Sequence, residues 1–201
     1  MHDHEKAEKL LLDALQRHPN NADLTAQLGV IYSHWKPNRR LTDARQQFKL
    51  AQQLECRQEW MYRTWIQMES SEQDWHGAAN VADETIKQGI ATKEIYALAG
   101  IAHSFLGRQY KRSLFLDKAE HEFRTADRYL RKGLKTPEQL VTYADRKLNN
   151  RTFRALVISC DELGLIDDMH QFLDRWQREH PDDPDAWSEG QRLREKHPHH
   201  I

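Results

Sequence analysis

Apolar residues recur every three or four positions along almost the whole chain, with charged and amide side chains between them. That spacing is typical of amphipathic helices, each burying one stripe of its surface. Leu, Ala, Gln, Glu, Lys and Arg dominate the sequence, and all of them are good helix formers. Alternating runs rich in Val, Ile and Thr are nearly missing. The pattern therefore predicts an all-α chain with helices near 4–18, 21–35, 39–54, 58–71, 74–89, 92–106, 110–132, 137–148, 151–163, 167–180 and 184–196.

One spacing of small and large residues repeats along the chain. Ala7, Leu11, Ala14 and Pro19 give a small residue, a large apolar residue four later, a small residue three later and a proline five later. Small residues let two helices approach closely, and proline ends a helix. Four further copies keep the spacing with substitutions: Ala44, Phe48, Ala51 and Cys56; Ala78, Ala82 and Thr85; Ala119, Phe123 and Ala126; Met169, Leu173, Trp176 and Pro181.

A second pattern lies before most of these copies and marks a preceding helix. Leu28 and Gly29 are followed by Tyr32, and related patterns are Tyr62 with Trp65, Ile66 and Glu69; Tyr96 with Ala99, Gly100 and His103; Phe153 with Leu156, Val157 and Cys160. The two patterns stay in phase with each other. Insertions are expected near Lys36-Pro37-Asn38 and between Arg108 and Leu116.

In these motifs the sequence resembles the tetratricopeptide repeat family over nearly its whole length. The resemblance implies an α-solenoid of antiparallel helix pairs, wound into a right-handed superhelix of about 10–11 helices, as one domain spanning 1–201. The expected units are a half repeat at 4–19, repeats at 22–56, 59–90 and 93–132, an extra helix at 136–148 opened by Thr136-Pro137-Glu138, a repeat at 150–181, and a capping helix at 184–196.

The first predicted helix matches the second helix of a repeat and has no first-helix partner. Leu10, Leu11, Leu12 and Leu15 make its end of the array apolar, whereas terminal repeats are usually capped by polar surfaces. Two explanations are open. The chain could be the C-terminal part of a longer protein with more repeats or an effector domain, which we favour, or this helix could pack on another copy.

The resemblance places the ligand of such an array on the concave face, which the first helices of the repeats line. The partner-binding residues expected there are Trp60, Arg63, Gln67, Glu94, Arg151 and Arg154. Tryptophan and arginine often dominate the binding energy of interfaces. Ala26 and Val30 occupy the slots where the family's carboxylate clamp has Lys and Asn, so that mode of binding is not expected.

Charge is unevenly distributed along the chain. Residues 108–154 contain 13 Lys and Arg against 6 Asp and Glu, and residues 155–190 contain 2 against 10. A basic stripe is expected from Arg124, Arg128, Arg131 and Lys135, which recur at helical spacing. Such a stripe could contact the phosphates of nucleic acid. The adjacent acidic block favours the alternative that the stripe is solvated or meets that block.

Composition excludes several classes of function. The net charge of −1 points neither to nucleic acid nor to an acidic partner. Cys56 and Cys160 stand far apart with no CxxC, which fits a reducing, cytoplasmic location. No apolar run is long enough to span a membrane, so no membrane partner is expected. Phosphate loops, nucleophile elbows and metal-binding spacings are missing, so we expect no catalytic residue, cofactor or metal; the histidines at the two ends would bind metal only incidentally.

The sequence therefore predicts a module for protein–protein interaction, not an enzyme, that binds a peptide or protein in its groove. The resemblance suggests the recognition or regulatory part of a larger bacterial protein, since similar arrays end signalling NTPases and defence effectors. A self-assembling scaffold and a nucleic-acid-binding solenoid are the two alternatives, motivated by the apolar first helix and by the basic stripe.

Overall fold

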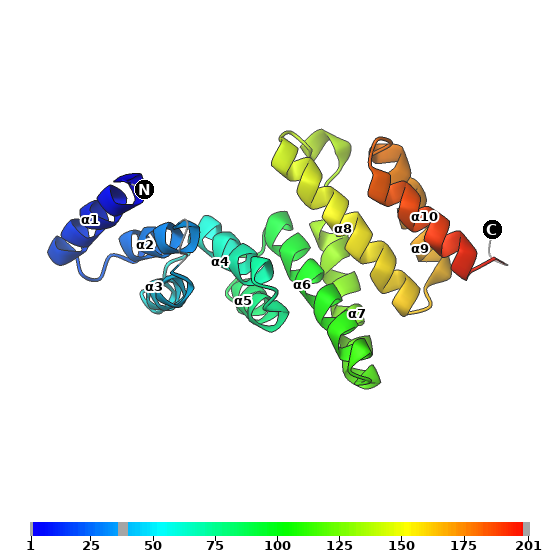
Figure 1. Cartoon of the computed structure of the whole chain (residues 1–201), viewed down its shortest axis with the longest axis horizontal. Coiled ribbons are helices and arrows are strands. Elements are labelled where there is room, and N and C mark those ends of the chain that lie inside the picture. The colour runs from blue at the N-terminus through cyan, green and yellow to red at the C-terminus, as the bar shows by residue number, and fades with distance from the viewer. Residues whose placement is uncertain (1, 36–39, 199–201) are drawn as a thin grey trace. The chain divides into compact units, whose positions relative to one another are not determined.

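The computed structural model describes residues 2–35 and 40–198 and confirms an all-α helical repeat architecture. Within these ranges the chain forms ten α-helices and one short 3-10 helix, and no strand. Within each of its two compact units, successive helices pack on one another, as in a solenoid (Figure 1). The insertion predicted near Lys36-Pro37-Asn38 lies outside the described residues. None of the described helices is both long and apolar enough to cross a membrane.

The chain divides into two compact units, 1–74 and 75–201. Unit 1 contains α1 (His2–Arg17), α2 (Ala22–His34), α3 (Leu41–Gln53) and α4 (Glu59–Ser71). Unit 2 contains α5 (Trp75–Lys87), α6 (Lys93–Arg112), α7 (Leu116–Gly133), the 3-10 helix η1 (Pro137–Gln139), α8 (Tyr143–Glu162), α9 (Ile166–Glu179) and α10 (Pro184–Lys196).

The repeating slots found in the sequence are the buried positions of both units. Every member of the copies on α3, α5, α7 and α9 is at most 3 % exposed: Ala44, Phe48, Ala51; Ala78, Ala82, Thr85; Ala119, Phe123, Ala126; Met169, Leu173, Trp176. The first-helix slots on α2, α4 and α8 are buried as well. Periodicity therefore identified the core correctly, because the slots face the neighbouring helix in each pair.

Two glycines in unit 2 allow α6 and α7 to touch along their length. A Cβ atom added to Gly100 would lie 2.4 Å from Cγ of Leu130, and one added to Gly133 would lie 2.5 Å from the backbone nitrogen of Ala97. No side chain fits at either distance, so the close approach of this helix pair depends on glycine.

Two predicted helix boundaries in unit 2 are wrong. A break was expected around Gly107, but α6 runs through it to Arg112, because Gly107 packs against the ring of Phe123 on α7. The expected insertion after Arg108 instead lengthens α6, and the turn to α7 comes at 113–115.

The predicted extra helix at 136–148 is also wrong. Thr136 and Gln139 do form a capping box, but it opens only the single turn η1. A second capping box, made by Thr142 and Asp145, starts α8, which continues through the expected turn at Asn149. Asn149 is buried and accepts a hydrogen bond from the backbone N–H of Lys135 at 3.0 Å, so tertiary contacts keep the helix intact there. The capping helix at the end was predicted correctly, with Asp183 as N-cap and Pro184 in the first turn.

Helix α1 contacts the rest of unit 1 through partly buried apolar residues and through polar contacts. Between Asp3 and Arg17 no residue is buried, and Leu10 and Leu12 are 70 % and 41 % exposed. Glu8 accepts hydrogen bonds from the Tyr32 hydroxyl at 2.8 Å and from Arg40 at 2.6 Å. The repeat slots on α1 are thus only partly covered, unlike those of the other second helices.

Candidate partner-binding groove

The exposed face of α8 lies between two cavities of unit 2. One cavity, of about 210 Å³, lies between α6 and α8 and has an apolar floor with a basic rim; it is lined by Ile101, Ser104, Phe105, Arg108, Arg151, Arg154, Ala155 and Ile158. The other, of about 730 Å³, lies between α8, η1, α9 and the start of α10. Arg151 and Arg154 line both cavities. We call the two cavities with this shared face the α8 groove.

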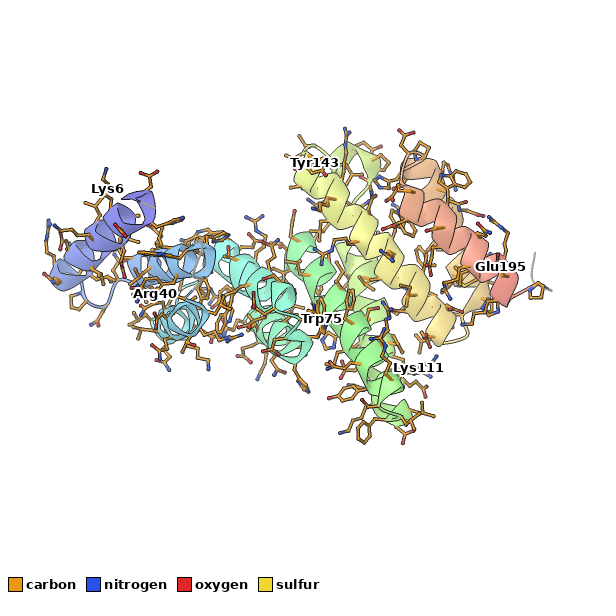
Figure 2. The ribbon with its side chains drawn as sticks, viewed as in Figure 1. Lys6, Arg40, Trp75, Lys111, Tyr143 and Glu195 are labelled. Atoms are coloured by element: carbon orange, nitrogen blue, oxygen red, sulfur yellow. The ribbon has the colours of Figure 1, made fainter. Side chains whose placement is uncertain are left out.

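The larger cavity has a basic wall and an acidic wall. Arg146, Lys147 and the two shared arginines come from α8, and Tyr143, 81 % exposed, stands at the start of that helix (Figure 2). Asp182, Asp183 and Asp185 come from the turn before α10 and its first residues. A ligand in this cavity would therefore meet groups of both signs.

The two shared arginines differ in their partners. Arg154 donates a hydrogen bond to Asp185 at 2.9 Å, and both side chains are about half exposed. Arg151 has no carboxylate partner among the described residues. Although Arg151 is exposed, its surroundings exclude enough water to lower the pKa of the guanidinium. Hydrogen bonds to Glu69 and Glu189 instead raise the pKa values of Arg45 and Arg192.

Three buried polar atoms on residues of the larger cavity have no hydrogen-bond partner in the described part of the chain. They are Oδ1 of Asn150, Nε1 of Trp176 and Oε2 of Glu179. The other carboxylate oxygen of Glu179 accepts a hydrogen bond from Arg175 at 2.6 Å. Buried polar groups are normally paired, so one donor and two acceptors remain unsatisfied behind the wall of this cavity.

The other predicted groove residues lie in unit 1 or are already paired. Trp60, Arg63 and Gln67 all lie on α4; Trp60 and Arg63 are half-buried and Gln67 is exposed. Arg63 lies 3.9 Å from Glu59, a loose contact. In unit 2, Glu94 is held by an ion pair with Lys135, which also bonds Asp145 at 2.7 Å. Glu94 is thus engaged within the fold.

The predicted basic stripe lies along α7 and just beyond it, and its cations contact neighbouring side chains. Arg124 pairs with Glu120 at 2.6 Å, and Arg131 pairs with Asp127 at 2.8 Å and Asp168 at 2.5 Å. In a separate contact, the guanidinium of Arg128 lies 5.1 Å from the centre of the Tyr129 ring. Lys135 is only 12 % exposed. Arg131–Asp168 joins the basic and acidic blocks of the sequence inside unit 2, which favours a structural use of this charge.

Sequence reasoning missed several groove residues. Arg108 lies beyond the expected end of its helix at residue 106, Asn150 was assigned to a turn, and Phe105 lies within the expected helix but was not assigned to the groove. Their positions depend on α6 and α8 being longer than a repeat helix, which local signals contradicted. The helical spacing of the cations Lys147, Arg151 and Arg154 was the one usable signal.

The two thiols are buried, and the described histidines near the two ends contact other side chains. The thiols of Cys56 and Cys160 are free and buried, and burial raises the pKa of Cys160 to about 12. His197 lies 2.8 Å from Asp161, and His4 stacks on Trp35; His199 and His200 lie outside the described residues. The described residues contain no group of three or more His, Cys, Asp and Glu that could hold a metal ion.

Comparison with known proteins identifies no relative: no protein-family model matches the chain, and no curated protein matches it. The resemblance to tetratricopeptide arrays therefore remains a prediction based on its motifs.

Proposed function

We propose that this protein is a protein-interaction module of tetratricopeptide type that binds an extended, acidic peptide segment in the α8 groove. The observation that carries the proposal is Arg151, a guanidinium without a carboxylate partner among the described residues that lines both cavities. A carboxylate of a partner would supply the missing counter-charge through charge-assisted hydrogen bonds.

Two further features support a peptide as the ligand. The apolar floor made by Ile101, Phe105 and Ile158 fits an apolar side chain beside the acidic one. The larger cavity adds donors on Arg146 and Lys147 and acceptors on Asp182 and Asp185, which match the C=O and N–H groups of an extended main chain. The buried thiols fit the proposed cytoplasmic location.

Selection of random peptides displayed on phage tests this function. Enriched peptides are expected to contain Asp or Glu next to an apolar residue. Labelled copies titrated by fluorescence anisotropy should bind Arg151→Gln at least about tenfold more weakly, because arginines in such positions are often interface hot spots.

The matched control is Arg178→Gln, which removes an exposed arginine on α9 that lines neither cavity. It should bind like the wild type, as should Trp60→Ala if the site is confined to unit 2. Failure to enrich any peptide, or equal binding by Arg151→Gln, would refute the proposal.

A self-assembling scaffold is the second candidate, favoured by the exposed leucines of α1. Light scattering at increasing protein concentration is expected to show a rising mass that Leu10→Glu with Leu12→Glu abolishes. Leu50→Glu is the control, since Leu50 is 42 % exposed on α3 of the same unit. A monomer at every concentration would remove this candidate. Three of the four cations of the basic stripe, Arg124, Arg131 and Lys135, are paired with carboxylates, so the stripe gives no such support to a nucleic-acid function.

A further inference from the structure

The turn between α6 and α7 exposes three large apolar residues in a row. Leu114, Phe115 and Leu116 are 81 %, 55 % and 61 % exposed, and every residue from 111 to 118 is exposed. In Figure 1 this turn lies at the free end of the α6–α7 hairpin, which extends past the C-terminal end of α8. Single exposed apolar residues are common on protein surfaces, but a contiguous group of them marks an interaction site.

Folding does not account for leucine at position 114. Leu114 has a φ of 62°, in the left-handed region that favours glycine. Glu55, Gln73, Gly89 and Gly164 adopt the same conformation after other helices, and each is polar or a glycine. Leu114 therefore carries a conformational cost without burying its side chain. That combination indicates a role outside the folded core.

Three amides of the turn are hydrogen-bonded within the turn itself. The N–H groups of Ser113, Leu114 and Phe115 donate within the turn to carbonyl groups of residues 109–111, at 3.0 to 3.1 Å. Unpaired N–H groups would oppose entry into lipid, where no water replaces a missing hydrogen bond. The three turn amides carry no such penalty.

Cations surround the apolar residues. Residues 108–118 include four Lys and Arg and one Asp, a net charge of +3. Lys111 pairs with Glu162, and Lys118 lies over the rings of Tyr110 and Phe115 at 5.6 and 5.3 Å. Arg112 has no carboxylate partner among the described residues. Apolar side chains within a basic ring match the interface of an anionic bilayer, with acyl chains below negative headgroups.

We propose that residues 113–116 form a lipid-contact tip, which inserts Leu114, Phe115 and Leu116 into an anionic membrane surface while the neighbouring cations stay among the headgroups. The contact is interfacial and needs no spanning helix, so it differs from the expectation of no membrane partner, which rested on the length of apolar runs. It is also independent of the α8 groove and of any peptide bound there.

Flotation of the full chain with lipid vesicles tests the proposal. The protein is expected to float with vesicles containing phosphatidylserine, and to float at least about tenfold less with pure phosphatidylcholine. High salt should weaken the binding, since it screens the headgroup charge. Arg112→Gln with Lys118→Gln should reduce the preference for phosphatidylserine.

The decisive variant replaces the apolar tip without harming the fold. Leu114→Gly suits the positive φ, and Phe115→Asn suits the N-cap of α7, where Phe115 makes no side-chain cap. The double variant should unfold at a temperature at least as high as the wild type. Its flotation should drop roughly tenfold or more, because two large apolar side chains no longer enter lipid.

Val141→Asn is the matched control, because Val141 is 80 % exposed in the same unit but lies outside the tip. It should float like the wild type. No flotation with phosphatidylserine, equal flotation with uncharged vesicles, or undiminished flotation of the folded double variant would each overturn the proposal.

Discussion

Raising the pH from about 6.5 to about 9 is expected to lower the free energy of unfolding of unit 2 by about 3 kcal/mol through His103 alone. His103 lies on α6, only 6 % exposed, between two carboxylates. Its Nδ1 is 2.5 Å from Glu122 on α7, and its Nε2 is 3.2 Å from Asp83 on α5. Tyr129 donates a third hydrogen bond to Asp83 at 3.0 Å.

The direction of the effect follows from the pKa of His103. Burial lowers this pKa, but the hydrogen bonds and charges of Asp83 and Glu122 outweigh it and raise the pKa from 6.5 to about 9. Below the unfolded value both states carry the proton, and the ion pairs contribute fully. As the pH rises, the unfolded chain loses the proton first, and the contribution falls until the folded imidazole loses its proton near pH 9. The hydrogen bond and charge of His103 also help to lower the pKa of Asp83 against its burial.

Urea unfolding at a series of pH values measures this effect, and hydrogen exchange of α6 and α7 localises it. At pH 6, His103→Gln is expected to have a lower free energy of unfolding than the wild type. Between pH 6 and pH 9, its free energy of unfolding should fall much less than that of the wild type. His121→Gln serves as the control, since His121 is exposed on α7. If the free energy of unfolding of the wild type changes with pH as little as that of His103→Gln, His103 is not the source of the pH dependence.

Replacing Arg45 with methionine is expected to destabilise unit 1 by about 3 kcal/mol. The variant leaves Glu69, whose side chain is 3 % exposed, without its counter-charge. Arg45 donates to both carboxylate oxygens of Glu69, at 2.9 Å from Nε and 2.6 Å from Nη2. Glu69 also accepts a hydrogen bond from Nε1 of Trp65 at 2.9 Å, which keeps it inside the core. Removing the cation from a buried carboxylate lowers the stability of the fold far more than breaking an ion pair on the surface.

A double variant separates this cost from the loss of packing. Arg45→Met with Glu69→Gln removes both charges but keeps an acceptor for Trp65, so it should recover most of the lost stability. Lys49→Met is the control, because Lys49 is exposed on the same helix and should change stability by less than about 0.5 kcal/mol. If Arg45→Met unfolds in urea like Lys49→Met, the pair is not an important contributor.

The charged residues show why the candidate site was only partly predictable. Arg124, Arg128 and Arg131 lie on one helix, as their spacing predicts, but Arg131 and Lys135 also pair with residues of other helices. Asp168 lies 37 residues beyond Arg131, and Asp145 ten residues beyond Lys135. Conversely, Arg151 differs from Arg154 only because Asp185 packs beside one of them. The local sequence pattern does not predict which of these cations will lack a carboxylate partner.

The sequence by itself determined the class of fold and the core of this protein. Small and large residues at fixed spacing, such as Ala44, Phe48 and Ala51, identify the helix faces that must be buried, because helical periodicity is local. Only the tertiary structure decided where α6 and α8 end, since packing of Gly107 on Phe123 and the hydrogen bond of Asn149 override local stop signals. It also decided which charges are paired and that Leu114, Phe115 and Leu116 remain uncovered, because burial depends on neighbours distant in sequence.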